Sequence, residues 1–253
     1  MSKLPFLLFA CVILVLAQLA NAMEIRVASQ DSAPKYMLSS DGEMSGICID
    51  IMHAIEADNP SIRFTGAKNI LPFKRIESYL QSGRIDAFFG FLKTEQREAL
   101  YTILPTPIFP VRYVMAVRRE DTLQAATMND IRQLGNGGVV MTIFGTANVD
   151  FLNGQSGILV DENAATVSQL LNKLISGRGR FAYYYDIGLI HTIKELGLAN
   201  KVRILPSVIN ETWQYVVFSK EADPEKVEAV RKALSKLKGN GTLDAIYRKY
   251  AVL

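Results

Sequence analysis

The chain has 253 residues, with 28 lysines and arginines against 25 aspartates and glutamates, and a formal net charge of +3 at pH 7. Its most basic stretch, residues 225–250, mixes acids and bases at helical spacing, which is typical of a solvated helix face and not of nucleic-acid binding. Only one of the two cysteines, Cys48, lies beyond the first 22 residues. A chain that begins after those residues has no intrachain disulfide, so its stability must come from a buried core.

The first 22 residues have the pattern of a cleaved signal peptide. Lys3 precedes an apolar stretch from Leu4 to Ala17, and Ala20-Asn21-Ala22 places small residues where a signal peptidase reads them. An uncleaved membrane anchor is the alternative, because the apolar stretch approaches spanning length. The small-residue end favours cleavage, which leaves 231 of the 253 residues, starting at Met23, in the periplasm.

The rest of the chain alternates strand-like apolar runs with amphipathic helical segments. A first set predicts strands at 24–29, 61–67, 85–91 and 111–119, and helices at 46–58, 73–83 and 94–101. A second set predicts helices at 127–134, 146–152, 163–177 and 187–197, and strands at 138–144, 157–161, 180–186, 201–206 and 212–220, before two helices that begin at 224 and 242. This alternation predicts an α/β fold with mostly parallel sheets flanked by helices. No Pro- or Gly-rich linker separates the two sets, so two lobes joined by extended strands fit better than two tethered domains.

Three strand ends carry polar groups, and ligands of parallel sheets bind at the carboxyl ends of strands. The first is "AFFGFLKTEQR", where Thr94 is a probable N-cap and Arg97 lies in the first helical turn. A helix start favours anions, and the guanidinium adds a planar fork that can hold a carboxylate. The alternative is a surface arginine paired with a nearby acid such as Glu95 or Glu98.

The other two strand ends lie in the second set. Gly145 and Thr146 separate a strand from a helix, so backbone N–H groups and a hydroxyl could meet a ligand there, or Thr146 could simply cap the helix. Asp186 ends a strand after three tyrosines, where a carboxylate could receive an ammonium group or cap the next helix. An anion site, a Gly-Thr turn and an acid together would suit a small zwitterion.

The mature chain resembles the periplasmic solute-binding proteins of amino-acid ABC transporters, a two-lobed α/β family with the type II periplasmic binding fold. The resemblance is collinear and rests on five segments: "DSAPKYMLSSDGEMSGICIDIMHAIEA", "LQSGRIDAFFGFLKTEQREALYTILPTPIF", "GTANVDFL", "RFAYYYD" and "KGNGTLDAIYRKY". It implies one lobe made of residues 23–115 and 213–253 and a second lobe made of residues 116–212, joined by two crossing hinge strands. The lobes of such proteins close on a small ligand by hinge bending.

The resemblance also implies roles for single residues. Arg97 would clamp the ligand α-carboxylate with help from Thr146, and Asp186 would take the α-amino group from the other lobe. Three further residues fall where the family lines the first-lobe wall: Asp31, Tyr36 and Phe73. Of these, Tyr36 or Phe73 would cover the ligand side chain. Asp50 matches the family's turn aspartate, which we interpret as structural.

Two departures bear on the ligand. Amino-acid binders of this family commonly have a small hydroxyl residue before the Thr-x-x-Arg helix, whereas "GFLKT" offers Gly90, Phe91 and no such residue. Phe73 and Phe91 would make the pocket more aromatic, and Arg75 could add a second cation. The prediction is therefore an amino acid or close relative, with a dicarboxylate, an aromatic acid or a short peptide left open.

An enzyme is the weaker hypothesis. His53 and His191 are the only histidines, and neither has a metal-ligand spacing partner or a nucleophile motif beside it. The same fold hosts a periplasmic dehydratase, which keeps the hypothesis open. We expect a monomeric binder without a cofactor or nucleic-acid partner. Its partner is an ABC transporter permease, or alternatively a chemoreceptor or sensor kinase.

Overall fold

The structure is a computed structural model that describes residues 22–124, 126–144 and 146–251. The signal-peptide prediction, apart from Ala22, and Gly145 lie outside these residues. Contacts divide the chain into two compact units: unit 1 runs to Phe109 and again from Gln214 to Tyr247, and unit 2 runs from Pro110 to Trp213 and from Arg248 onward. The chain thus passes from unit 1 to unit 2 after Phe109, six residues before the expected lobe boundary at 115. It returns to unit 1 after Trp213, one residue after the expected boundary at 212, and the residues from Arg248 onward group with unit 2.

Unit 1 contains most of the first predicted set and the C-terminal helices. Its elements are β1 (Met23–Arg26), β2 (Met37–Leu38), β3 (Met44–Ser45), α2 (Ile47–Asp58), β4 (Ile62–Thr65), α3 (Phe73–Gln81), β5 (Ala87–Leu92), α4 (Glu95–Leu100), β6 (Thr102–Ile103), α9 (Pro224–Gly239) and most of α10 (Thr242–Tyr250). β1 pairs with β4 in parallel, and Val27, directly after β1, forms one parallel bridge with Ala87 of β5. The end of β11 (Val202–Phe218) pairs with β5 and β6 in antiparallel fashion.

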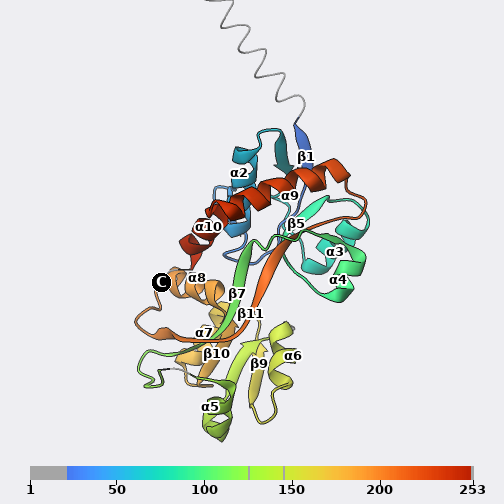
Figure 1. Cartoon of the computed structure of the whole chain (residues 1–253). Helices are drawn as coiled ribbons and strands as arrows, with labels where there is room; N and C mark the ends of the chain where they lie inside the picture. Colours follow the sequence, from blue (N-terminus) through green and yellow to red (C-terminus); the bar gives the residue numbers. More distant parts are fainter. Residues whose placement is uncertain (1–21, 125, 145, 252–253) are drawn as a thin grey trace, which may run out of the picture. The chain divides into compact units, whose positions relative to one another are not determined.

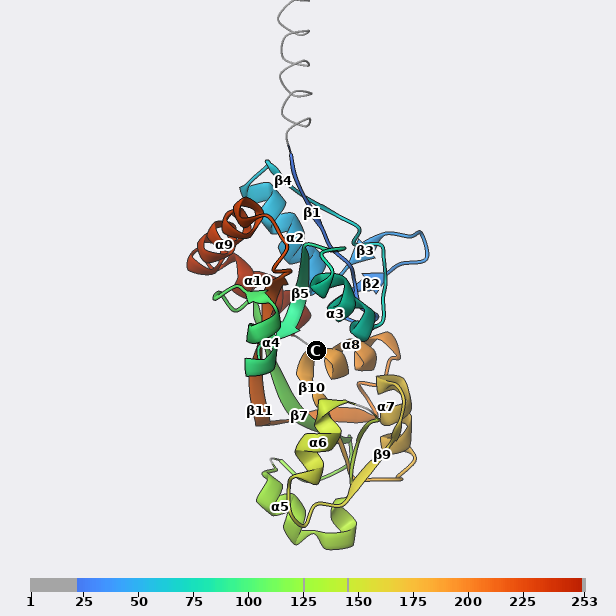
Figure 2. The ribbon, with the colours of Figure 1, turned by 90° about the vertical axis from the view of Figure 1, so that its right-hand side faces the viewer.

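Apolar periodicity explains how the helices of unit 1 pack. The inward side of α2 buries residues three and four positions apart, among them Ile51 and Ile55, and α9 buries Val230, Leu234 and Leu237 with the same spacing. Both views in Figures 1 and 2 show α2 and α9 side by side, in agreement with their contacts. Burial of these stripes, and not a disulfide, holds the unit together.

Unit 2 is a sheet with helices on both faces. Its elements are β7 (Phe109–Arg118), α5 (Met128–Gln133), a short 3-10 turn (Gly135–Gly138), β8 (Val140–Ile143), α6 (Ala147–Asn153), β9 (Val160–Ala164), α7 (Val167–Ile175), β10 (Phe181–Tyr185), α8 (Asp186–Glu195) and most of β11. β8 pairs in parallel with β9 and β10, and β7 pairs with β10 in antiparallel fashion. One core cluster joins α7 and α8 to the sheet and a second joins α5 and α6 to it, as alternating strand side chains require.

The predicted helices are all found, whereas the prediction of two strands at 201–206 and 212–220 is wrong. The structure has one strand, β11, across both segments. Pro206 lies within this strand, because a proline without an N–H group is compatible with a strand wherever no ladder bond needs that N–H. The short strands β2, β3 and β6 were not expected, because two-residue pairings leave no periodic signal. None of the helices in the described ranges is long and apolar enough to cross a membrane.

Candidate functional site

A bulge at Gly90 shapes the end of β5. Phe89 pairs with Val216 and Phe91 pairs with Tyr215, so Gly90 is an extra residue in the ladder. Its φ is +82°, which L side chains rarely adopt. The extra residue breaks the strict alternation, and the rings of Phe88 and Phe91 meet with centroids 6.3 Å apart.

Arg97 lies over the aromatic surface made by this bulge. Its guanidinium carbon is 4.4 Å from the centroid of Phe91 and 5.0 Å from that of Phe73. Its Nη1 donates to the carbonyl of Leu92 at 3.1 Å, and its Nη2 donates to Oε1 of Glu77 at 3.2 Å. Two of the five guanidinium N–H donors therefore have acceptors, and the described part of the chain supplies none for the other three.

Neither Glu95 nor Glu98 pairs with Arg97. Glu98 pairs with Lys93 at 2.8 Å, and the partner of Arg97 is Glu77, in α3 and twenty residues upstream. The Arg97 side chain is 21% exposed, so the cation is held at the edge of the unit with donors still directed away from its protein partners. This arrangement suits a carboxylate ligand, because a fixed guanidinium loses little entropy when it forms two parallel hydrogen bonds.

Thr94 has the predicted capping role. It precedes α4 with extended dihedral angles, and its Oγ1 accepts a hydrogen bond from the backbone N–H of Arg97 at 3.3 Å. The hydroxyl thus stabilises the first turn that carries Arg97. α4 has only six residues, so we assign no ligand to its N-terminus as such.

The wall residues implied by the resemblance separate into an exposed and a buried set. Asp31 is exposed and lines a shallow hollow with Phe73, Leu71 and Ile70. Tyr36 is only 2% exposed, and its hydroxyl donates to the carbonyl of Phe89 at 2.8 Å. Burial raises the pKa of Tyr36 well above its usual value, so the hydroxyl stays protonated and donating. In this structure Tyr36 acts as a support of the β5 bulge.

In unit 2, the predicted groups lie at the ends of β8 and β10. The Oγ1 of Thr146 donates to the carbonyl of Ile143 at 2.8 Å and does not cap α6. Asp186 opens α8, and its Oδ1 accepts from the backbone N–H of Ile187 at 2.7 Å. Phe144 is 71% exposed at the end of β8, an aromatic side chain that the sequence analysis did not single out.

The remaining candidates play smaller parts. Asp50 lies in the first turn of α2, as expected of a structural turn residue. His53 is exposed, His191 lies 3.5 Å from Glu195, and Arg75 is exposed on α3. Within the described ranges no three His, Cys, Asp or Glu side chains are grouped so that they could hold a metal ion.

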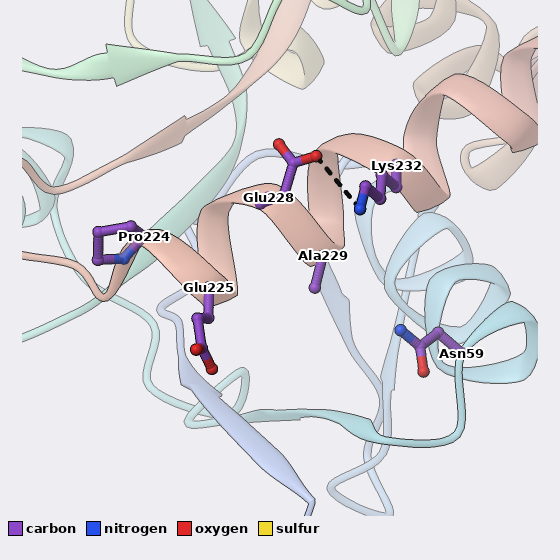
Figure 3. A pocket seen from close by; sticks show the side chains of 6 residues that line it. All are labelled: Asn59, Pro224, Glu225, Glu228, Ala229 and Lys232. Atoms are coloured by element: carbon purple, nitrogen blue, oxygen red, sulfur yellow. Dashed lines mark ion pairs between the residues drawn. The ribbon is translucent and has the colours of Figure 1, made fainter.

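A groove of unit 1 between α2 and α9 is a poorer candidate. Figure 3 shows it between Asn59, after the end of α2, and the first turns of α9. Glu228 in its wall pairs with Arg231 at 2.6 Å and with Lys232 at 3.5 Å. The hydrogen bond from Arg231 lowers the pKa of Glu228 to about 2, so this carboxylate is already neutralised by neighbouring cations.

The sequence family is decided by one comparison. The sequence profile of the bacterial extracellular solute-binding proteins, family 3, matches residues 25–252. The chain belongs to this family. A search among curated proteins found no significant match.

Solved structures of similar proteins have the same fold as this solute-binding protein. The probable amino-acid ABC transporter extracellular-binding protein ytmK from Bacillus subtilis is 16% identical with a TM-score of 0.76, over 90% of this chain and 97% of the other. The second substrate binding domain of a putative amino acid ABC transporter from Streptococcus pneumoniae Canada MDR_19A is 21% identical with a TM-score of 0.72, over 91% and 100%. The ancestral amino acid-binding protein AncCDT-1, a precursor of cyclohexadienyl dehydratase, is 17% identical with a TM-score of 0.67, over 90% and 96%. The expected fold class, the α/β type II periplasmic binding fold, is confirmed.

Proposed function

We propose that this solute-binding protein binds an amino acid or a closely related organic acid in the periplasm and delivers it to an ABC transporter. Family membership supports the binding of a small solute, and the similar proteins from Bacillus subtilis and Streptococcus pneumoniae are named as parts of amino-acid ABC transporters. The observation that carries the proposal is Arg97, whose guanidinium contacts Phe91 and Glu77 while three of its five donors have no acceptor in the described part of the chain.

Arg97 takes the ligand carboxylate in this proposal. A half-buried guanidinium binds a carboxylate through two charge-assisted hydrogen bonds, which are shorter and stronger than neutral ones. The rings of Phe91 and Phe73 exclude water from one side of the fork and so strengthen the electrostatic attraction. Thr146 and Asp186 are proposed to contribute from unit 2 when the protein closes on its solute, through contacts that stabilise only the closed form.

The experiment is a thermal-shift panel on the protein from Met23 onward, with amino acids, organic acids and short peptides. A ligand that binds only the folded state raises the melting temperature by mass action. Arg97→Lys keeps a cation but loses the fork, so we expect at least a tenfold loss of affinity for carboxylate ligands. Arg231→Lys is the matched control, because Arg231 also forms a fork-like pair, with Glu228, but on the surface of α9. Equal affinity in the wild type and Arg97→Lys would contradict the clamp.

The same panel addresses the enzyme hypothesis and the choice of partner. Turnover of any stabilising compound would favour the dehydratase-like alternative, for which AncCDT-1 provides the structural analogy. A permease partner predicts that ligand-loaded protein stimulates ATP hydrolysis by its transporter in vesicles. Loaded protein that has no effect on any such transporter but alters a chemoreceptor or sensor kinase would contradict delivery.

A further inference from the structure

Three side chains of unit 1 converge on the bulge at Gly90. A Cβ atom placed on this glycine would lie 3.2 Å from Sγ of Cys48, 3.5 Å from Cδ of Lys35 and 3.7 Å from Oε1 of Gln214. The three residues come from the loop before β2, from α2 and from β11. The missing side chain at Gly90 therefore lets two long polar side chains approach the backbone of β5 closely.

Neither polar side chain has a hydrogen-bond or ion-pair partner in the described part of the chain. Gln214 is only 3% exposed, and its Oε1 is buried and accepts no hydrogen bond. Lys35 is half-buried, and the described part of the chain places no carboxylate within ion-pairing distance of its Nζ. Buried polar groups in folded proteins are nearly always satisfied, so the unsatisfied amide of Gln214, beside a lysine without a described carboxylate partner, points to a ligand.

Cys48 does not supply the missing charge. Its thiol is fully buried, and burial raises its pKa to about 12, so it is neutral at physiological pH. Burial also lowers the pKa of Lys35, because desolvation disfavours the charged ammonium. An anion that enters beside Gly90 would compensate this ammonium.

We propose that Lys35 and Gln214 form a subsite in unit 1 for a second acidic group of the solute, so that the ligand class is a small dicarboxylate. This inference rests on the proposed function, in which Arg97 takes the first carboxylate. Gly90 and Phe91 are consecutive residues of β5. Gly90 lies beside Lys35, and the ring of Phe91 lies under Arg97. Both cations therefore border the same end of the strand. An ammonium favours an anion over a neutral amide. Oε1 of Gln214 cannot bond to a carboxylate, but Nε2 donates to it once the amide oxygen and nitrogen exchange places, since their assignment follows from the partners present. Lys35, and not Arg75, is then the second cation.

The ligand test compares acids with their amides. Glutamate, aspartate, glutarate and succinate are titrated against glutamine and asparagine by calorimetry with the wild type, Lys35→Met and Arg97→Lys. We expect the wild type to prefer a dicarboxylate over the matching amide by at least tenfold, and Lys35→Met to lose that preference. Glutamate against glutarate separates an amino dicarboxylate from a plain one. Lys68→Met is the control, since Lys68 is exposed and pairs with Glu43 at 3.2 Å.

The outcomes separate the two proposals. Binding that needs Arg97 but is unchanged in Lys35→Met, or that favours amides, overturns the subsite alone. Binding that needs Lys35 but is unchanged in Arg97→Lys overturns the clamp. Absence of binding by every compound contradicts both.

A ligand-free measurement gives independent evidence. Lys35→Met removes an uncompensated ammonium and keeps a similar volume, so we expect the melting temperature of the free protein to rise by a few degrees, as happens when a strained binding group is removed. A lysine with a structural role would give a fall instead. A fall in Lys35→Met, with Lys68→Met unchanged, would overturn the subsite.

Discussion

Glu77 of α3 pairs with Arg97 of α4, with 3.2 Å between Oε1 and Nη2, and both side chains are about four-fifths buried. A cation in the first turn of α4 opposes the positive end of the helix dipole, and α4's own acids do not compensate it. The compensation comes from Glu77 and from the rings of Phe73 and Phe91. Tertiary contacts thus stabilise the cation of Arg97 at this position, whereas the dipole of α4 alone would disfavour it.

The first prediction concerns the stability of ligand-free Arg97→Ala. The variant loses a largely buried ion pair, a hydrogen bond to Leu92 and two ring contacts, so we expect the free energy of unfolding to fall by about 1–2 kcal/mol in urea denaturation. Arg75→Ala, an exposed site on α3, should remain within about 0.5 kcal/mol of the wild type. Equal stability of Arg97→Ala and the wild type would mean that the contacts seen around the guanidinium contribute nothing.

The second prediction compares two glycines with nearly the same backbone. Gly42 has φ +80° and no atom within 4 Å of an added Cβ, whereas at Gly90, with φ +82°, the added Cβ would be 3.2 Å from Cys48. Gly42→Ala therefore costs backbone strain alone, about 1 kcal/mol, and Gly90→Ala costs strain plus crowding, about 2–3 kcal/mol. Urea denaturation of both variants measures the difference. Equal losses would show that Cys48 and Lys35 move aside easily.

Much of the fold could be predicted because its signals are local. The helix at 163–177 has apolar residues at helical spacing and becomes α7, and the apolar run at 85–91 becomes β5. The single strand β11 could not be predicted, because Pro206 reads as a break when the neighbouring strands are unknown. Local patterns place elements well, but they do not show which chain segments pair.

The site was less predictable for the same reason. Arg97 could be found from its place after a strand, but its partner Glu77 lies twenty residues away and no spacing rule connects them. Gly90 was singled out by the family resemblance, yet its bulge depends on the register with β11. Lys35 and Gln214 carry no sequence signal, because they meet only through the fold.

The third prediction concerns the thiol of Cys48. The residue is fully buried and burial raises its pKa to about 12, whereas thiol reagents attack the thiolate. The folded protein from Met23 onward should therefore react with Ellman's reagent only as fast as it unfolds, and one equivalent should react at once in 6 M guanidinium. Rapid labelling of the native protein, with the unfolding rate unchanged, would show that the thiol is accessible.

The fourth prediction concerns Asp86, which ties three elements of unit 1 together. Its buried carboxylate accepts hydrogen bonds from the backbone and side chain of Arg26, the last residue of β1, and from Nζ of Lys226 in α9. Burial acts to raise the pKa of Asp86, but these bonds outweigh it and the net pKa lies below the usual 3.8. Asp86→Asn should lower the free energy of unfolding at pH 7 by about 2 kcal/mol, since it leaves two cations less well compensated.

The pH dependence of this loss follows from the direction of the shift. A carboxyl group whose pKa is lower in the folded protein stabilises it fully above the unfolded pKa and loses that contribution as the pH falls through the folded pKa. The stability difference between the wild type and Asp86→Asn should therefore be constant above about pH 5 and shrink below pH 3.8. Other carboxyl groups titrate in the same range, but they are common to both proteins and cancel in the difference. A difference that does not change between pH 7 and pH 2.5 would mean that the loss comes from altered packing and not from the charge of Asp86.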